Sequence, residues 1–292
     1  MNRPLELGGA ADFRRDRTLD VLVPTRNRPA ELAVTLSGLA ANSVAGFGVV
    51  VSDQSDGEPA WEHPAVAAMV RVLRHRGHPV LLTRRLPRRG LAEHRAYLLD
   101  QSLAGYVLYL DDDVWLEPGT VHRLLAAIGE LGCGFVGNGV HGLSYLEDYR
   151  PEAYRHFEPW VGPPVPERIR PGTPQWDRAR IHSAANLLHL TEVHALADGT
   201  WQAYKVSWIG GCVLYDRECL RDAGGFDFWR QLDDRHQGED VAAQLAVLQR
   251  YGGAGILPSG AYHLESPTTV TERAVEAWEV VLAGPGYPTN DR

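Results

Sequence analysis

Three adjacent carboxylates, Asp111, Asp112 and Asp113, directly follow the apolar run at residues 106–110. Their negative charges repel one another, and a bound divalent cation would remove that repulsion. Oxygen ligands of this kind suit Mg²⁺ or Mn²⁺, and such ions keep coordination positions for the phosphates of a substrate. The run therefore predicts a cation site that binds a phosphorylated ligand, with a solvated acidic turn as the alternative.

A second acidic pair, Glu239 and Asp240, follows Gly238 and begins an apolar-periodic run over residues 241–248 that is typical of a helix. Acidic residues in the first turn of a helix are favoured by its dipole, so a simple helix start is one interpretation. A carboxylate that is ionised at neutral pH can also accept the proton of an attacking hydroxyl group. The pair is thus also a candidate general base, which a substrate could approach over the glycine.

The elements that must hold these acids alternate along the first half of the chain. Short apolar runs, expected as strands, are separated by stretches with apolar residues at helical spacing. Strands are expected at 19–23, 49–51, 80–82, 106–110 and 135–136, and helices around 32–39, 66–73, 96–99 and 124–128. This alternation predicts an α/β fold with a mostly parallel sheet and helices on both faces. Ligands of such sheets bind beyond the carboxyl ends of the strands, where the three aspartates lie.

The alternation fails between residues 141 and 206, a segment rich in Tyr and Trp. A structureless loop of that length is unusual, so we expect an elaborated surface subdomain. Most of its rings would form a small core, while exposed rings would stack on the apolar C–H faces of sugars. Regular structure is expected to return with a strand at 213–215, a helix from Arg217 and the helix that begins with the acidic pair.

Composition limits the classes of function. The chain has 292 residues, 44% of them hydrophobic and 23% charged, which is typical of a folded globular protein. Its formal net charge of −8 argues against a general nucleic-acid binder. The sequence has no apolar run long enough to cross a membrane, no signal-peptide pattern at its N-terminus, and only three cysteines, which do not suggest a disulfide framework. These features predict a cytoplasmic protein.

Several short motifs occur in order along residues 18–266. They are VLVPTRN at 21–27, VVVSD at 49–53, GLAEHR at 90–95, LYLDDD at 108–113, WIGG at 208–211, AGGFD at 223–227, GED at 238–240 and YH at 262–263. Together they resemble the motifs of the family-2 glycosyltransferases, which have the GT-A fold and use nucleotide sugars. The resemblance implies a nucleotide-sugar-binding half at 18–140 and an acceptor-binding, catalytic half of the same domain at 141–266. Residues 1–17 are expected to be a flexible leader, and residues 267–292 a C-terminal helix and tail.

The resemblance also implies which residues bind the donor. Thr25 and Asp53 would contact its base and ribose with Arg26 beside them, and Arg95 would face the base or the diphosphate. Two purely structural interpretations stay open: Asp53 as a turn-forming carboxylate, and Arg95 as a core-capping arginine. The second is relevant because the family often has Asn where this chain has Ala96.

The acidic run is given separate roles by the same resemblance. Asp112 would bind the ribose, Asp111 would support the ribose or the metal, and Asp113 would bind the metal, Mn²⁺ or Mg²⁺. The late His263 would be a second metal ligand, although a lone histidine is more often structural.

On the acceptor side, the resemblance assigns acceptor contacts to Trp208, Gly210, Gly211 and Glu239, and the role of general base to Asp240. It implies an enzyme that moves a sugar from a nucleoside-diphosphate sugar, foremost a UDP-sugar, to an acceptor hydroxyl with inversion. The acceptor could be a saccharide, a lipid-linked molecule or a small molecule. Peripheral membrane contact and homo-oligomerisation stay open.

Two other classes of function compete with this one. A non-catalytic nucleotide-sugar or carbohydrate binder needs neither a metal-binding acidic run nor a late acidic pair. A sugar nucleotidyltransferase carries a glycine-rich loop after its first strand, and residues 24–29, PTRNRP, are not such a loop.

Overall fold

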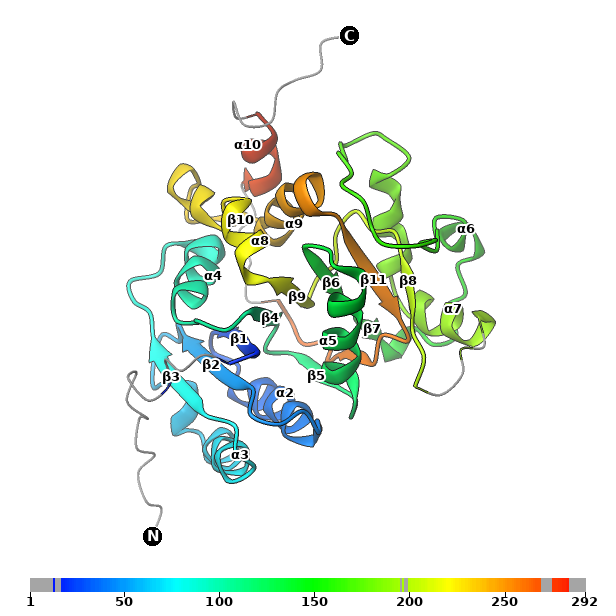
Figure 1. The fold of residues 1–292 in the computed structure, drawn as a ribbon. Helices are drawn as coiled ribbons and strands as arrows, with labels where there is room; N and C mark the ends of the chain where they lie inside the picture. Colours follow the sequence, from blue (N-terminus) through cyan, green and yellow to red (C-terminus); the bar gives the residue numbers. More distant parts are fainter. Residues whose placement is uncertain (1–12, 14–16, 195, 197–198, 269–274, 284–292) are drawn as a thin grey trace.

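The computed structural model describes residue 13 and residues 17–194, 196, 199–268 and 275–283. Within these ranges the main sheet has eight strands in the order β3-β2-β1-β4-β9-β6-β11-β8 (Figure 1). Its strands are β1 (Leu19–Thr25), β2 (Gly48–Asp53), β3 (Val80–Arg84), β4 (Tyr106–Leu110), β6 (Phe135–Gly137), β8 (Gln202–Tyr204), β9 (Cys212–Asp216) and β11 (Gly253–Leu257). The main helices are α2 (Pro29–Ala41), α3 (Pro64–His75), α4 (Gly90–Asp100), α5 (Thr120–Leu131), α8 (Arg217–Asp222), α9 (Glu239–Tyr251) and α10 (Ala277–Ala283). Every strand and helix that the sequence predicts is present.

Strand direction brings the polar strand ends together. Strand β1 runs parallel to both β2 and β4, and β3 runs parallel to β2. Thr25 is therefore in register with Asp53, and the acidic run begins at the same edge of the sheet, after β4. In the second half, β6 and β11 are parallel, whereas β9 runs antiparallel to β4 and β6, and β8 to β11. The predicted α/β fold with a mostly parallel sheet is confirmed.

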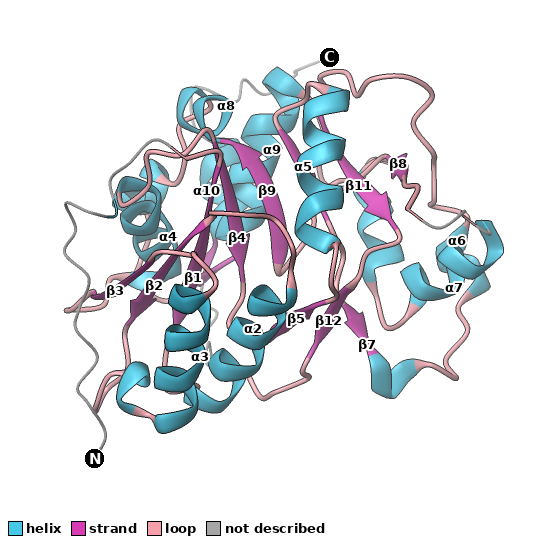
Figure 2. Ribbon diagram, turned by 60° about the horizontal axis from the view of Figure 1, so that its bottom comes forward, coloured by secondary structure: helices cyan, strands magenta, loops and turns pink. Residues whose placement is uncertain are grey.

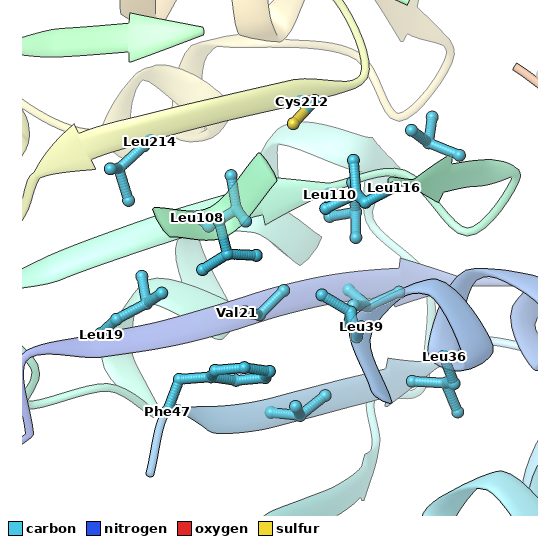
Figure 3. Packing of buried hydrophobic residues seen from close by; sticks show 14 of the residues in the cluster. Leu19, Val21, Leu36, Leu39, Phe47, Leu108, Leu110, Leu116, Cys212 and Leu214 are labelled. Atoms are coloured by element: carbon cyan, nitrogen blue, oxygen red, sulfur yellow. The ribbon is translucent and has the colours of Figure 1, made fainter. Parts of the chain in front are cut away.

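Side-chain alternation along the buried strands produces two cores, one on each face of the sheet. Val21 packs in a cluster with Leu36 of α2, while its neighbour Leu22 packs in the other cluster with Leu98 of α4 and Leu245 of α9. Figure 2 shows helices on both faces, and Figure 3 shows part of the first cluster between β1, β4 and α2. Burial on both faces explains why these strands are continuous apolar runs.

A second, three-stranded sheet positions the late histidine. It has the order β5-β12-β7 and consists of β5 (Val114–Leu116), β12 (Ala261–His263) and β7 (His141–Gly142). The antiparallel register of β5 and β12 places His263 opposite Val114, the residue after the acidic run. The backbone N–H of Leu264 also donates to the Asp113 carbonyl oxygen at 2.8 Å. Two segments far apart in the sequence are thus fixed side by side.

The segment 141–206 contains short elements, among them α6 (Pro151–Tyr154), a 3-10 helix at Trp176–His182, and α7 (Asn186–His194). Figure 1 shows α6 and α7 beside β8, at the end of the sheet away from β3. Tyr204 is fully buried and packs on Phe157 at 5.3 Å between ring centroids, whereas Tyr149 is 62% exposed. The segment therefore has both the core rings and the exposed rings that its composition predicts.

Most of the predicted leader, 1–17, and most of the predicted C-terminal tail lie outside the described residues. Phe13 is buried against the core, and α10 packs on α9. The boundary between halves at residue 140 stays a prediction, since strands from both sides share one sheet. None of the helices in the described part of the chain has the length and apolar character needed to cross a bilayer.

Candidate active site

A cavity of about 1350 Å³ lies at the carboxyl edge of β1, β2 and β4. Its walls come from the ends of these strands, the loop 86–91 at the start of α4, the segment 234–236 before α9, and the chain from His263 onward. All three acids of the run, Asp111 to Asp113, line it. The cavity is therefore where a parallel α/β sheet binds its ligands.

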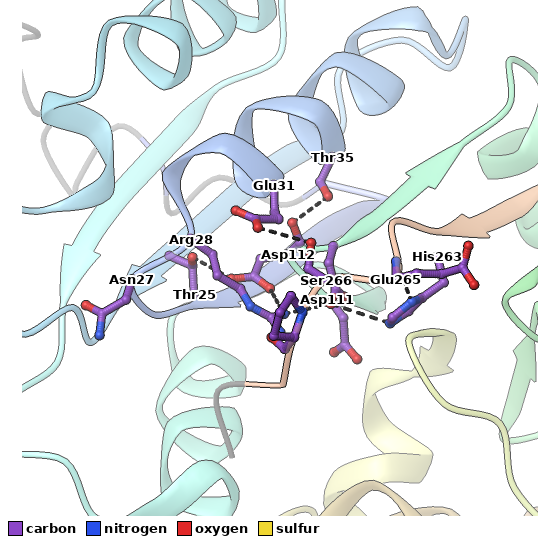
Figure 4. A network of polar contacts seen from close by, with 12 residues as sticks. Thr25, Asn27, Arg28, Glu31, Thr35, Asp111, Asp112, His263, Glu265 and Ser266 are labelled. Carbon is purple, nitrogen blue, oxygen red and sulfur yellow. Dashed lines mark hydrogen bonds and ion pairs between the residues drawn. The ribbon is translucent and has the colours of Figure 1, made fainter. Parts of the chain in front are cut away.

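The acidic run is held by β1 and α2. Asp112 accepts a hydrogen bond from Thr25 Oγ1 at 2.7 Å, and its backbone oxygen accepts one from Thr35 Oγ1 at 2.8 Å. Figure 4 shows these side chains converging from β1, α2 and the end of β4. Because Thr25 is hydrogen-bonded to Asp112, a donor that contacts Thr25 as predicted would also lie next to the Asp112 carboxylate.

A residue outside the predicted set, Arg28, lies between two of these acids. Its Nη1 atom is 3.1 Å from Asp112 Oδ1 and 2.6 Å from Asp113 Oδ2, and its Nη2 donates to the carbonyl oxygen of Pro267. Burial by itself would lower the pKa of Arg28, but the charges of Asp112 and Asp113 outweigh it and raise that pKa. Its place in the PTRNRP motif, just before α2, gave no signal that the side chain turns back to the acids.

Asp112 and Asp113 hold protons more tightly than free aspartates do, because the pKa of each is raised. Burial raises the pKa of Asp112 to about 7, against the hydrogen bond from Thr25 and the charge of Arg28, while the charge of Asp113 adds to the rise. Burial and then the charge of Asp111 raise the pKa of Asp113, and His263 and Arg28 oppose the rise. Additional positive charge at this point would favour the ionised forms.

Asp113 and His263, the predicted metal ligands, lie together, with Asp113 Oδ2 3.4 Å from His263 Nε2. Within the part of the chain that the structure describes, no three His, Cys, Asp or Glu side chains gather into a complete metal site. A carboxylate and an imidazole nevertheless fit Mn²⁺ or Mg²⁺, which commonly take their remaining ligands from phosphates and water. His263 Nδ1 accepts the N–H of Glu265 at 2.8 Å, so a metal at Nε2 would require the other tautomer.

Asp53 and Arg26 shape the other side of the cavity. Asp53 is fully buried, and its carboxylate accepts the backbone N–H groups of Ser55 and Ala60, both at 2.6 Å. These contacts hold the loop that brings Gln54 and Ser55 to the cavity wall. Arg26 lines the cavity and pairs with Asp56 at 3.1 Å. Direct donor contacts of Asp53 and Arg26 stay predictions.

Arg95 lies behind the cavity wall and joins the two acidic motifs. Its Nη2 donates to Asp111 Oδ1 at 3.0 Å and its Nε to Glu239 Oε1 at 2.8 Å, while its side chain is only 6% exposed. Burial would lower the pKa of Arg95, but the charges of Asp111 and Glu239 raise it. Arg95 is absent from the lining of the large cavity, so its predicted contact with the donor stays untested.

The predicted base, Asp240, lies beside a much smaller space of about 10 Å³ that Arg95 and Gly211 also line. Asp240 Oδ1 accepts the N–H of Val241 at 2.8 Å in the first turn of α9. Burial raises the pKa of Asp240 to about 7, the charge of Glu239 adds to this, and Arg95 opposes it. This value suits a general base, because efficient bases titrate near the working pH.

The glycines of the WIGG motif allow the backbone to pass close to the acids. A Cβ atom at Gly210 would lie 3.9 Å from Asp240 Oδ2. Gly211 has φ +80°, and a Cβ there would lie 3.0 Å from Val140 Cγ1. Its carbonyl oxygen accepts the N–H of Asp111 at 2.9 Å. Both glycines therefore lie where the two acidic motifs meet.

Trp208 belongs to an aromatic cluster. Its ring centroid is 4.6 Å from that of Trp176, which is 5.0 Å from that of Trp278 in α10. Trp208 is partly exposed, and its acceptor contact stays a prediction.

Comparisons with known proteins give a family and a fold. The sequence matches the family model described as glycosyl transferase family 2 over residues 20–187, more than half of the chain. No curated protein matches the chain.

Among solved structures, the fold is similar to that of S. aureus TarS. The crystal structure of TarS 1–349 has a TM-score of 0.54 and 16% identity, and the similarity covers 85% of this chain and 60% of that one. The complex with UDP-GlcNAc has a TM-score of 0.52, with 16% identity and coverage of 87% and 60%. The complex with UDP has a TM-score of 0.53, with 16% identity and coverage of 84% and 60%. The present chain thus spans 60% of the length of these TarS chains.

Proposed function

The chain belongs to glycosyl transferase family 2, and on that premise we propose that this glycosyltransferase moves a sugar from a UDP-sugar to the hydroxyl group of an acceptor. The reaction would depend on Mn²⁺ or Mg²⁺ and invert the anomeric configuration. The observation that carries the proposal is the cavity of about 1350 Å³ with the acids Asp111 to Asp113 on its wall. UDP is placed first among the nucleotides because TarS, which is similar in fold, was crystallised with UDP and UDP-GlcNAc.

The chemistry of the cavity wall supports one orientation of the donor. Over β2 and the start of α4 the wall has uncharged or apolar groups such as Gln54, Leu86 and Leu91, together with Asp56 and Arg88, whose charges pair at 3.6 Å. His94 belongs to this end as well, and burial lowers its pKa to about 3, so it is neutral at pH 7. A nucleobase is uncharged and flat, and it suits this end. The diphosphate suits the β4 end, where Arg28 and a cation held by the acidic run would balance its negative charge.

At the β4 end, Asp113 and His263 would hold the metal, and Arg28 contributes a further positive charge. Asp112 lies beside Thr25, in the place proposed for the ribose. A bound divalent cation would neutralise charge on the diphosphate leaving group. In this proposal the residues of the acidic run orient the donor, so that the bond between the sugar and the diphosphate points away from the nucleobase end.

Asp240 is proposed as the general base. The acceptor oxygen forms a bond to the anomeric carbon while the bond from that carbon to the diphosphate oxygen breaks, and the hydroxyl proton moves to the Asp240 carboxylate. A single displacement of this kind inverts the configuration. Arg95 would hold Glu239 and Asp111 in place on either side of the reacting groups. Acceptor contacts are proposed for Glu239, Trp208 and the two glycines.

The acceptor, a saccharide, a lipid-linked molecule or a small molecule, is proposed to contact the segment 141–206, where Tyr149 is exposed. A cytoplasmic location is part of the same proposal, and it is supported by free thiols at Cys133, Cys212 and Cys219.

An assay of UDP release tests the function without knowledge of the acceptor. The protein is incubated with UDP-sugars and Mn²⁺, and slow donor hydrolysis is measured with and without EDTA. Metal-dependent release of UDP would support the transferase, whereas donor binding without release would indicate a non-catalytic binder. The anomeric configuration of the released sugar, followed by NMR at early times, then distinguishes inversion from retention.

A further inference from the structure

Arg28 pairs with Asp113, the carboxylate that is proposed to hold the metal. One of its nitrogen atoms, Nη1, contacts both Asp112 Oδ1 and Asp113 Oδ2, at 3.1 and 2.6 Å. The three side chains are 12%, 9% and 7% exposed, so this small ion cluster is largely shielded from water. Figure 4 shows the guanidinium group in the middle of the polar network, between the acids and the chain after His263.

The two carboxylates of the cluster need a positive partner to stay ionised. Two shielded carboxylates without a partner are strongly destabilising, and Arg28 supplies the missing charge in the structure as it stands. His263 Nε2 approaches the same oxygen of Asp113, at 3.4 Å. A divalent cation bound between Asp113 and His263 would lie next to the guanidinium group, and the two positive groups would repel each other.

Arg28 also has another anion to bind. It lines the same cavity as the acids, where the diphosphate of the donor is proposed to lie. The guanidinium fork matches phosphate oxygens in shape and charge. Its second nitrogen, Nη2, donates to the Pro267 carbonyl oxygen, a neutral partner that is easier to leave than a carboxylate.

We propose that Arg28 is an exchangeable counter-ion: it pairs with Asp112 and Asp113 before the divalent cation binds, is displaced from Asp113 by that cation, and then binds the diphosphate of the donor. The inference rests on the proposed function for the metal and the donor. It predicts that Arg28 opposes binding of the metal alone but favours binding of metal and nucleotide together. If Arg28 had only a structural role, its substitution would not change these two affinities in opposite directions.

Two calorimetric titrations test both predicted changes in affinity: one with Mn²⁺ alone, and one with UDP at saturating Mn²⁺. Arg28→Gln keeps a hydrogen-bond donor but loses the charge, and should bind Mn²⁺ alone at least about tenfold more tightly than the wild type. The same variant should bind UDP with Mn²⁺ about tenfold more weakly. Arg26→Gln is the matched control, because Arg26 lines the same cavity but pairs with Asp56, and it should leave the affinity for Mn²⁺ alone unchanged.

An Arg28→Gln variant that binds Mn²⁺ alone no more tightly than the wild type would overturn the proposal. If wild-type protein binds UDP and Mn²⁺ normally in that case, the proposed function stands and only the role of Arg28 fails. If neither protein binds UDP with Mn²⁺, the proposed function fails as well.

A second measurement uses the unmodified protein and does not depend on the variant folding. The side-chain NMR signals of Arg28, assigned in ¹⁵N-labelled protein, are followed during titration with diamagnetic Mg²⁺. Release from the acids should shift the Arg28 signal in step with Mg²⁺ binding, while the Arg26 signal stays in place. Mg²⁺ binding with an unchanged Arg28 signal would contradict the exchange.

Discussion

Asp111, Asp112 and Asp113 line a cavity of about 1350 Å³, whereas Asp240 lies beside a space of only about 10 Å³. A space of the second size is at the lower limit for one water molecule and cannot hold a sugar. The first acidic motif therefore borders a cavity with room for a ligand, while Asp240 of the second motif is partly buried and borders a space too small for one. The difference teaches that the proposed donor site already has room for its ligand, whereas the small space beside the proposed base has no room for an acceptor sugar.

The two motifs also differ in the cations that balance them. Arg28 reaches the first from the cavity itself, whereas Arg95 reaches the second from inside the protein and also holds Asp111. A cation that lines the cavity can exchange partners with a ligand. Arg95, which is held between Asp111 and Glu239, is instead a buried link between the two acidic motifs.

The largest effect is expected from Asp240→Asn. The amide keeps the size of the side chain but cannot take a proton, so turnover should fall by about 10²–10⁴-fold. Affinity for UDP with Mn²⁺ should stay normal, because Asp240 does not line the large cavity. Steady-state kinetics and calorimetry on the same preparation separate the two quantities. Near-normal turnover would indicate that Glu239 is the base instead. The turnover of Glu239→Gln would then test that role.

Arg95→Met should have the next largest effect, on stability. It leaves Asp111 and Glu239 without the arginine that joins them, and breaking a buried pair costs about 3–5 kcal/mol in the free energy of unfolding. It should also raise the pKa of Asp240 further, because Arg95 opposes that rise.

Arg178→Met is the matched control for Arg95→Met. Arg178 is equally buried and joins Glu158 to Glu167 away from the acids. Urea unfolding and the pH profile of turnover are measured for both variants. A pH profile that shifts equally in both, or in neither, would contradict the role of Arg95 as a link between the two motifs.

The pH dependence of turnover should follow Asp240. Its pKa lies near 7, and only the ionised form accepts a proton. Turnover at saturating donor should therefore be nearly constant above about pH 8 and fall about tenfold per pH unit below pH 6. Buffers of matched ionic strength keep salt effects out of the pH profile. A flat profile between pH 5 and 8 would exclude Asp240 as the titrating base.

The smallest effect is expected in the segment 141–206. Tyr149→Ala removes an exposed ring that stacks on His189 at 4.2 Å. If this ring contacts the acceptor, the KM for the acceptor should rise by about 2–10-fold with donor affinity unchanged. Val193→Ala, at a similarly exposed position, serves as the control. An equal loss of donor affinity would place the segment in the donor site instead.

The polar edge of the sheet could be predicted from the sequence because local signals agree there. Each apolar run is followed by polar residues, and parallel strands bring those residues to one edge, as the register of Thr25 with Asp53 shows. The position of Arg28 could not be predicted, since residue type does not reveal which way a long side chain turns.

Other parts of the site depend on contacts between distant segments. Strand β12 is a three-residue strand whose partner, β5, lies far away in the sequence, so periodicity gave no sign of the pair that fixes His263 beside Asp113. The link through Arg95 was likewise hidden, because α4 and α9 meet only in the folded chain. The short elements of 141–206 have too few residues to show a period.

Metal-dependent binding of UDP to wild type and Asp113→Ala tests the central claim most directly. Calorimetry is performed with and without Mn²⁺, and thermal unfolding confirms that the variant is folded. We expect Mn²⁺ to strengthen UDP binding to the wild type by at least about tenfold and to have no such effect in the variant. UDP binding that is equally strong in both proteins, with and without Mn²⁺, would contradict a metal-dependent donor site at the acidic run.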